Sequence, residues 1–300
     1  MEMIERRIPS CDGIHQLYCR VYIPDGEPAG LFHVAHGMTE HISRYDGFMR
    51  EIAEEGYICY GYDHLGHGYT ANDDSELGYL GNWKLLVEDL QSVSRLMKSE
   101  HPSLPCFLLG HSMGSFIARC AATPRIWNKV IFMGTGGPTP AAKAGLAVVR
   151  AKIKKDGERA TSPEIEKMVF GSYRKRFKDE DDVISWISTK KEVRDTYRGD
   201  KFCTFHFTLN GFYTLLKLHT LCNSKTWFKK VGSTLTILLV SGSDDPVGNY
   251  GKGVKKVYNT LKANGKNVRM KLYDGCRHEI LNDSKKDEVI KDILDFIRAA

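Results

Sequence analysis

The sequence predicts an α/β fold, with a mainly parallel central sheet flanked by helices and a helical cap inserted into it. Short β-branched or aromatic runs alternate with amphipathic helical stretches, which is typical of a parallel sheet covered on both faces. The pentapeptide GHSMG at 110–114 follows an apolar run and precedes a helix-forming stretch. The alternation fails over residues 138–231 and then resumes, which indicates an insertion.

The expected strands are short apolar runs, and the expected helices are longer amphipathic stretches. The strands are His15–Ile23, Leu31–Ala35, Tyr57–Tyr62, Cys106–Gly110, Lys129–Met133, Leu235–Val240 and Val268–Tyr273. The helices are Arg44–Glu55, Leu85–Glu100, Ser115–Ala122, Lys252–Asn264 and Lys285–Ala299. We therefore expect residues 1–137 and 232–300 to form the core and residues 138–231 to form the cap.

The positive charge of the chain is concentrated in the expected cap. The whole chain has a net charge of +6, and residues 138–231 hold 20 Lys and Arg against 11 Asp and Glu. A solvated lid surface is the simpler and favoured explanation of this balance, and attraction to anionic lipid surfaces or head groups is the alternative. No nucleic-acid-binding motif accompanies the charge, so we expect no nucleic-acid partner. Peripheral contact with a membrane or micelle through the basic cap remains the sharper interpretation.

Cysteine usage and the first residues favour a cytoplasmic protein. None of the eight cysteines forms a Cys-x-x-Cys pair, and Cys59 and Cys106 lie in expected buried strands. This pattern is typical of reduced thiols rather than of a disulfide framework. The N-terminal residues lack the apolar stretch of a secretory signal, and no run approaches about 18 apolar residues. Peripheral membrane association stays open because of the basic cap.

The GHSMG segment predicts a sharp strand-to-helix turn that exposes the hydroxyl of Ser112. A serine hydroxyl becomes a strong nucleophile only when a base removes its proton. Downstream of this serine, His206 and His219 fall in the expected cap, whereas His278 follows the last expected strand. The carboxyl ends of parallel strands meet at one edge of a sheet, so we favour His278 as the base.

An acid that orients the base is expected after the preceding strand, where Asp244 and Asp245 are adjacent. Consecutive side chains point in different directions, so only one of them can orient the imidazole. We favour Asp245 because Pro246 holds its backbone extended. Its role is to fix the tautomer of the imidazole and to stabilise the imidazolium.

Two backbone amides are expected to stabilise the oxyanion of a tetrahedral intermediate. One is the N–H of Met113, directly after the nucleophile. The other is the N–H of Met38, because Gly37 allows an unusual turn at the end of an earlier strand. We expect Glu40 and His41 to orient this loop.

Five motifs together resemble the monoacylglycerol lipase and lysophospholipase branch of the α/β-hydrolase family. They are HGMTEH at 36–41, DHLGHG at 63–68, GHSMG at 110–114, GSDD at 242–245 and the terminal His278. The resemblance implies an α/β-hydrolase fold, an acid at Asp245 and oxyanion donors at Met38 and Met113. It also implies hydrolysis of acyl esters through an acyl-enzyme on Ser112, with no cofactor and no metal.

The DHLGHG motif has a second interpretation, because Asp63, His64 and His67 are potential metal ligands. No further Cys, His or acid cluster lies nearby in the sequence, so a hydrogen-bonded loop that braces the serine turn fits better. Within the cap, Phe205, Phe212 and Leu146 are candidates for contact with the substrate, and a slot lined by such residues favours an acyl chain.

Two other functions remain open from the sequence. Relatives of this fold include proline-releasing aminopeptidases, so an aminopeptidase or amidase is the alternative enzyme. A non-catalytic, ligand-binding homologue is the alternative from another class, but it predicts that at least one of Ser112, Asp245 and His278 is replaced. The motifs favour a small lipid or ester as the substrate over both alternatives.

Overall fold

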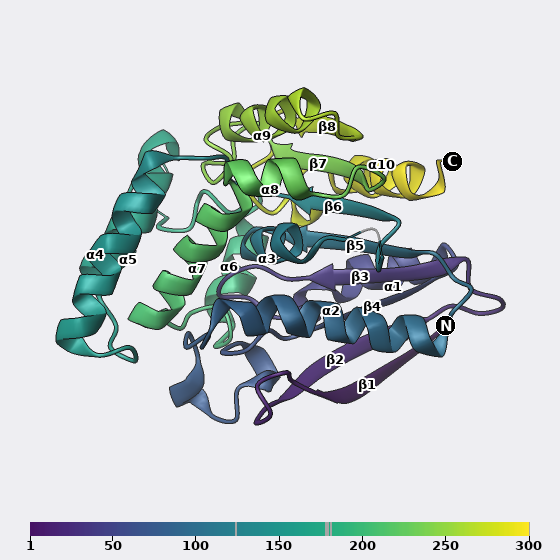
Figure 1. The fold of residues 1–300 in the computed structure, drawn as a ribbon, viewed down its shortest axis with the longest axis horizontal. Helices are drawn as coiled ribbons and strands as arrows, with labels where there is room; N and C mark the ends of the chain where they lie inside the picture. Colours follow the sequence, from purple (N-terminus) through teal and green to yellow (C-terminus); the bar gives the residue numbers. More distant parts are fainter. Residues whose placement is uncertain (124, 178–179, 181, 300) are drawn as a thin grey trace.

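The computed structural model describes residues 1–123, 125–177, 180 and 182–299. Within them the chain forms an eight-stranded sheet in the order β1-β2-β4-β3-β5-β6-β7-β8 (Figure 1). Strands β3 to β8 are parallel to one another, whereas β2 pairs in antiparallel fashion with its two neighbours, β1 and β4. The predicted mainly parallel sheet with flanking helices is confirmed.

The strands are β1 (Glu2–Pro9), β2 (Gln16–Ile23), β3 (Gly30–Ala35), β4 (Tyr57–Tyr62), β5 (Cys106–His111), β6 (Lys129–Met133), β7 (Thr236–Gly242) and β8 (Val268–Tyr273). The helices of the core are α1 (Asp46–Glu54), α2 (Trp83–Glu100), α3 (Met113–Ala121), α9 (Lys252–Ala263) and α10 (Lys286–Arg298). Short 3-10 turns occupy Ile42–Tyr45, Gly68–Thr70, Asp74–Glu76, Tyr173–Phe177 and Ile280–Asn282.

Strand β1 is the element that the sequence pattern did not predict. It pairs with β2 along its whole length, from Glu2 opposite Ile23 to Pro9 opposite Gln16. Most of its side chains are exposed or half-buried, and several are charged. Charged residues on an edge strand discourage pairing with another molecule, and they also remove the apolar run that marks a strand.

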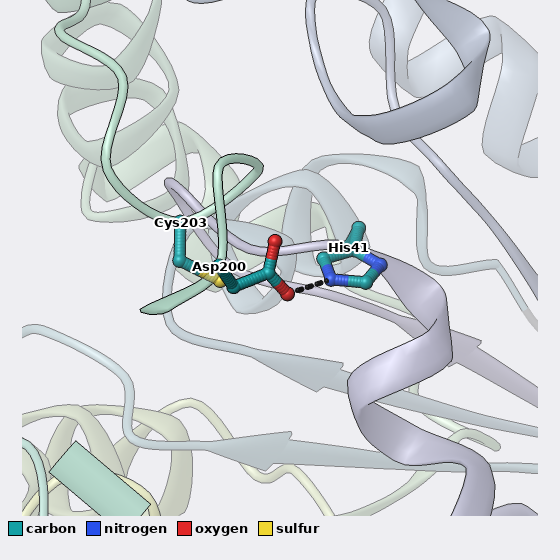
Figure 2. Close-up of side chains that lie close together, drawn as sticks. All are labelled: His41, Asp200 and Cys203. Carbon is teal, nitrogen blue, oxygen red and sulfur yellow. Dashed lines mark hydrogen bonds and ion pairs between the residues drawn. The ribbon is translucent and has the colours of Figure 1, made fainter. Parts of the chain in front are cut away.

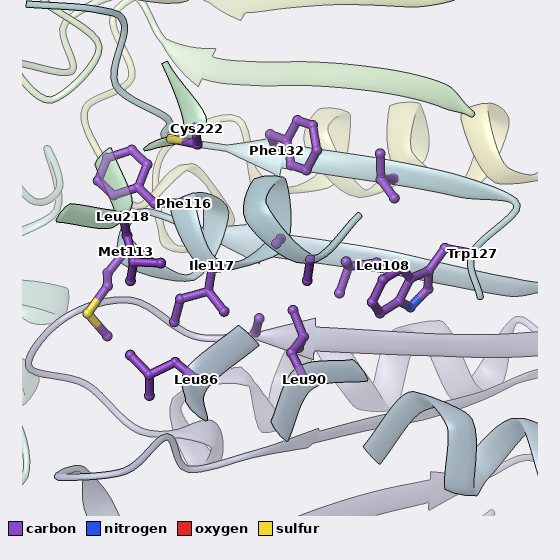
Figure 3. Close-up of a cluster of buried hydrophobic side chains, with 14 of the residues drawn as sticks. Leu86, Leu90, Leu108, Met113, Phe116, Ile117, Trp127, Phe132, Leu218 and Cys222 are labelled. Carbon is purple, nitrogen blue, oxygen red and sulfur yellow. The ribbon is translucent and has the colours of Figure 1, made fainter. Parts of the chain in front are cut away.

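Two apolar layers hold the helices against the sheet. On one face, α2 and α3 pack on each other and on the sheet, and Figure 3 shows Leu90 and Ile117 in this layer near Leu108 of β5. On the other face, α1 and α10 cover the sheet with residues such as Ile52 and Ile293. Covering both faces explains why the central strands are continuous apolar runs rather than alternating ones.

The cap lies between β6 and β7 in the chain and contains α4 (Pro140–Asp156), α5 (Pro163–Phe170), α6 (Lys191–Gly199), α7 (Leu209–Cys222) and α8 (Lys225–Lys230). Figure 1 shows these helices gathered at one end of the sheet. Helix α7 joins them to the core because it packs on both α4 and α3.

The buried guanidinium of Arg119 fastens the base of the cap to α3. It donates to the carbonyl of Cys222 at the end of α7 and to Oγ1 of Thr135, 3.2 Å away. Its guanidinium carbon also lies 4.5 Å from the ring centre of Trp227 in α8. A cation at the carboxyl end of a helix meets the negative end of the helix dipole.

In the parts of the chain that the structure describes, no helix combines the length and the apolar character needed to cross a membrane.

We expect Leu90→Ala to lower the free energy of unfolding by about 2–5 kcal/mol, because the side chain is fully buried between α2 and the sheet. Glu88→Ala on the exposed side of the same helix is the matched control and should change it by less than about 0.5 kcal/mol. Urea unfolding of both variants measures the difference. Equal effects would show that this layer does not carry the stability of the fold.

Candidate active site

Ser112 occupies the turn between β5 and α3 with a positive φ of 52° and ψ of −119°. A side chain at Gly114 would place its Cβ 2.2 Å from the carbonyl oxygen of Ala35, and one at Gly110 would place it 2.5 Å from the oxygen of Gly114. Both glycines are therefore required by close backbone approach. The strained turn is fixed further because the N–H of Ser112 donates to the carbonyl of Met133 at 2.9 Å.

His278 and Asp245 come from neighbouring loops at the same edge of the sheet. Nδ1 of His278 lies 3.0 Å from Oδ2 of Asp245, although the ring N–H does not point along that line in this conformation. The carboxylate is fully buried and is held by the N–H of Val247 at 2.9 Å and the hydroxyl of Ser241 at 3.1 Å. These donors aim Asp245 at the histidine.

Asp244 points elsewhere. Its carboxylate pairs with Arg176 of the cap at 3.0 Å, and its side chain is 27% exposed. The structure thus brings the second aspartate of the pair, and not the first, behind His278.

Ser112 and His278 line one cavity of about 780 Å³ beneath the cap. Gly134, with φ of 60°, lies next to the imidazole, and a Cβ there would be 3.1 Å from Cε1 of His278. The cavity is large enough for an elongated small molecule.

The loop after β3 lies against the serine. A Cβ on Gly37 would be only 3.0 Å from Cβ of Ser112. Met38 lines the cavity, and Thr39 has a positive φ of 48°. Met113, the other predicted donor, begins α3 directly after the serine, with its side chain buried. Both predicted amides therefore belong to segments that adjoin Ser112.

A buried ionic network supports this loop. Glu40 accepts from the N–H of Gly37, from Arg44 at 3.0 Å and from the hydroxyl of Tyr45 at 2.9 Å. Nδ1 of His111 lies 3.0 Å from the same carboxylate. Burial alone would raise the pKa of Glu40, but the hydrogen bond to His111 and the charge of Arg44 outweigh it and hold the pKa below its ordinary value.

The histidines of the DHLGHG segment form a buried cluster with His36, which belongs to the loop after β3. The rings of His36 and His64 are 4.2 Å apart, and the N–H of His64 donates to Nε2 of His36 at 2.9 Å. Asp63 accepts from the N–H of Ile42 at 2.7 Å. Burial lowers the pKa of His64 to about 3 and that of His67 to about 4, so both are neutral near pH 7. The contacts are those of a bracing loop.

A separate cluster of potential metal ligands lies where the loop meets the cap and consists of His41, Asp200 and Cys203. Their ring nitrogen, carboxylate oxygen and sulfur atoms lie within 4.8 Å of one another. Figure 2 shows the imidazole of His41 turned to the carboxylate of Asp200, with Nε2 to Oδ2 at 2.7 Å. Burial raises the pKa of the Cys203 thiol well above its ordinary value. A protonated thiol beside a histidine already bonded to a carboxylate is a structural brace, and we assign no metal to it.

The cap closes the cavity with apolar side chains. Phe205 and Phe212, two of the predicted contacts, line it. Leu146 is not among the described lining residues, and Ala142 and Gly145 of the same helix reach the cavity instead. The sequence did not single out Trp186, whose ring centre lies 5.2 Å from that of His278. Nothing in its local pattern marks it, because only the folded cap brings it to the imidazole.

Comparison with known proteins identifies the family. The family model described as "Serine aminopeptidase, S33" matches residues 26–285. The chain belongs to this family of α/β-hydrolases. It is 27% identical over 297 residues to a monoacylglycerol lipase from Mycolicibacterium smegmatis, covering 98% of this chain and 96% of that protein. A monoglyceride lipase from Homo sapiens is 31% identical over 146 residues, 49% of this chain and 43% of that protein.

Solved structures agree with this membership. A thermostable carboxyl esterase from Bacillus coagulans, solved in complex with glycerol, is 31% identical with a TM-score of 0.93, covering 99% of this chain and 98% of that chain. A monoglyceride lipase from Saccharomyces cerevisiae shares the fold, with a TM-score of 0.78 at 17% identity over 99% of this chain and 94% of that chain. The resemblance predicted from the motifs is confirmed.

We expect acid to destabilise the fold through the buried histidines. The pKa of His67 is about 4 in the fold and about 6.5 in an unfolded chain, so only the unfolded state takes up this proton as the pH falls from 6.5 to 4. This lowers the free energy of unfolding by about 1.4 kcal/mol per pH unit across that window.

His67→Gln should remove this one contribution, so the free energy of unfolding of the variant should fall less steeply between pH 6 and pH 4.5. His101→Gln, at the end of α2 and away from the cluster, is the control and should keep the wild-type slope. Urea unfolding at several pH values measures the slopes. Parallel slopes for wild type and His67→Gln would contradict the assignment.

Proposed function

We propose that this protein is a serine carboxylester hydrolase of the monoacylglycerol lipase or lysophospholipase type. The observation that carries the proposal is a single cavity lined by Ser112 and His278, with Asp245 buried 3.0 Å behind the histidine. Ser112 attacks the ester carbonyl, the alcohol leaves, and water then hydrolyses the acyl-enzyme.

In this mechanism His278 takes the proton of Ser112 and gives it to the leaving alcohol, while Asp245 holds the imidazole in the required tautomer. The amides of Met38 and Met113 donate to the oxyanion, each contributing about 3 kcal/mol in the transition state. The approach of Gly37 to Ser112 and the place of Met113 at the start of α3 support these roles.

The lining of the cavity supports an acyl chain as the part of the substrate that it holds. Aromatic and aliphatic side chains of the cap face it, including Phe205, Phe212 and Leu215. Such a slot favours an apolar chain over a polar one. The named activity of the M. smegmatis relative over nearly the full length, and the carboxyl esterase structure with glycerol, support an acyl ester of a small alcohol.

The aminopeptidase alternative takes support from the description of the family model. An aminopeptidase needs a free carboxylate to bind the substrate amine. Glu40, Glu166 and Glu279 are the described acidic residues that line the cavity, and each of them is already paired. Arg44 holds the first and third, and His206 holds the second at 2.9 Å. This favours an ester over an amine-bearing substrate.

The surface of the cap supports peripheral contact with lipid, which we also propose. Val148, Met168 and Val183 are large apolar residues of the cap that are about half-exposed or more, at 49%, 46% and 64%. Arg150 and Lys167 lie beside the first two in the sequence, whereas an aspartate precedes Val183. Apolar residues with neighbouring cations are typical of surfaces that bind an anionic lipid interface.

Replacement of the nucleophile tests the central step. Ser112→Ala should abolish turnover of a medium-chain p-nitrophenyl ester and of a monoacylglycerol, and should abolish labelling by a fluorophosphonate. Wild type should be labelled and should hydrolyse the monoacylglycerol far faster than a prolyl-naphthylamide. Wild-type turnover in the variant would refute the acyl-enzyme, and an unlabelled wild-type protein would favour the non-catalytic alternative.

The adjacent aspartates provide a matched pair for the acid. Asp245→Asn should lower kcat by about 10⁴-fold, since an amide supports the wrong tautomer of His278. Asp244→Asn makes the same chemical change one residue earlier, where the side chain pairs with Arg176, and should leave kcat within about threefold. Steady-state kinetics with one ester decides, and equal losses would contradict the assignment of the acid.

A further inference from the structure

The loop that carries His278 is bonded to the cap as well as to the core. The backbone N–H of His278 donates to the carbonyl of Trp186 at 3.3 Å, and that of Glu279 donates to the carbonyl of Ile187 at 2.8 Å. These two bonds run side by side, so a short stretch of cap backbone follows the loop. The position of the imidazole is therefore set in part by the cap.

Asp283 is the centre of this junction. Its side chain is fully buried. Oδ2 accepts from the N–H of Arg277 at 2.8 Å, and Oδ1 accepts from the N–H of Ser284 at 2.8 Å. From the cap, the N–H of Thr189 lies 3.3 Å from both oxygens, and the hydroxyl of Thr189 donates to Oδ1. One carboxylate thus joins both ends of the histidine loop to the cap.

All four donors are neutral N–H or O–H groups that point at the carboxylate, so its two oxygens serve as acceptors for four polar hydrogens. An amide or an apolar side chain at position 283 would leave some of these buried donors without a partner. The loop and the cap would then gain freedom relative to each other.

Arg277 and His278, in the same loop, make further contacts with the cap. The guanidinium of Arg277 donates to the carbonyl of Ser185 and to Glu180, and it covers the ring of Phe177 at 4.1 Å. The ring of Trp186 lies against His278, tilted by 44°. Asp283 itself is not among the described residues that line the cavity, so it acts through the loop and not on the substrate.

We infer that Asp283 is a positioning residue, which holds the imidazole of His278 in place by joining its loop to the cap segment at Thr189. This inference rests on the proposed role of His278 as the base. Because misplacement of a reacting group by about 1 Å can cost about a hundredfold in rate, the effect belongs to the chemical step and not to substrate binding.

Asp283→Asn tests the inference, because it keeps the size of the side chain but replaces one acceptor oxygen with a donor. We expect kcat to fall by about tenfold to a hundredfold, with KM within about twofold. The rate of fluorophosphonate labelling at Ser112 should fall in parallel. Asp287→Asn, the same change at an exposed residue in the first turn of α10, should leave all three quantities unchanged.

A pair at the cap end separates positioning from general stability. Thr189→Val keeps the shape of the side chain but removes the hydroxyl, and should show part of the loss in kcat. Thr189→Ser keeps the hydroxyl and should restore the rate. This pair decides the question even where Asp283→Asn does not fold, as judged by circular dichroism and urea unfolding.

An unchanged kcat in folded Asp283→Asn, a rise in KM alone, or equal rates for the two Thr189 variants would overturn the inference. These results differ from a failure of the proposed function. In that case wild type itself would resist labelling, or Ser112→Ala would keep its activity, whatever the variants at positions 283 and 189 do.

Discussion

The arrangement of the site depends on one guanidinium that is largely removed from water, that of Arg44. Arg44 lies between Glu40, which it meets at 3.0 Å, and Glu279, to which it donates two bonds of 2.8 Å. Glu40 belongs to the loop beside Ser112, and Glu279 follows His278 directly. Ion pairs removed from water persist only where their geometry is good and their remaining donors and acceptors are satisfied. Here Gly37 and Tyr45 satisfy Glu40, so the ion pairs of Arg44 join the two loops with their acceptors fully used.

The cap completes the same arrangement instead of lying over it as a separate layer. The hydroxyl of Tyr197 lies 2.7 Å from that of Thr39, and Asp200 is bonded to His41, so the cap holds the serine-side loop. The segment that ends at Thr189 holds the histidine-side loop. The shape of the cavity and the positions of Ser112 and His278 are therefore both coupled to the cap.

The parts of this architecture that are encoded locally could be predicted from the sequence. Strands β3 to β7 were recognisable because burial on both faces makes them nearly continuous apolar runs, whereas β1 was missed because it is a charged edge strand. The meeting of Ser112, Asp245 and His278 could be expected because the carboxyl ends of parallel strands share one edge.

The residues that support the site could not be predicted in the same way. Arg44 and Glu279 are 235 positions apart, and neither has a sequence context that points to the other. Trp186, Thr189 and Asp283 likewise acquire their roles only when the cap meets the histidine loop. Leu146 was predicted to contact the substrate, but Ala142 and Gly145 of the same helix line the cavity instead, because the sequence alone does not give the rotation of the helix about its axis.

Two features at one edge of the sheet oppose folding, namely the strained serine turn and the removal of the ion pairs from water. The apolar layer directly behind that edge offsets them, because its burial favours folding. Met113 and Ile117 of α3 are fully buried against α2 and the sheet, as Figure 3 shows for their side chains. Because α3 begins at the residue after Ser112, the packing that stabilises the helix also holds the turn in its positive-φ conformation. The hydroxyl of Ser112 is thus kept at the cavity by the same contacts that stabilise the core.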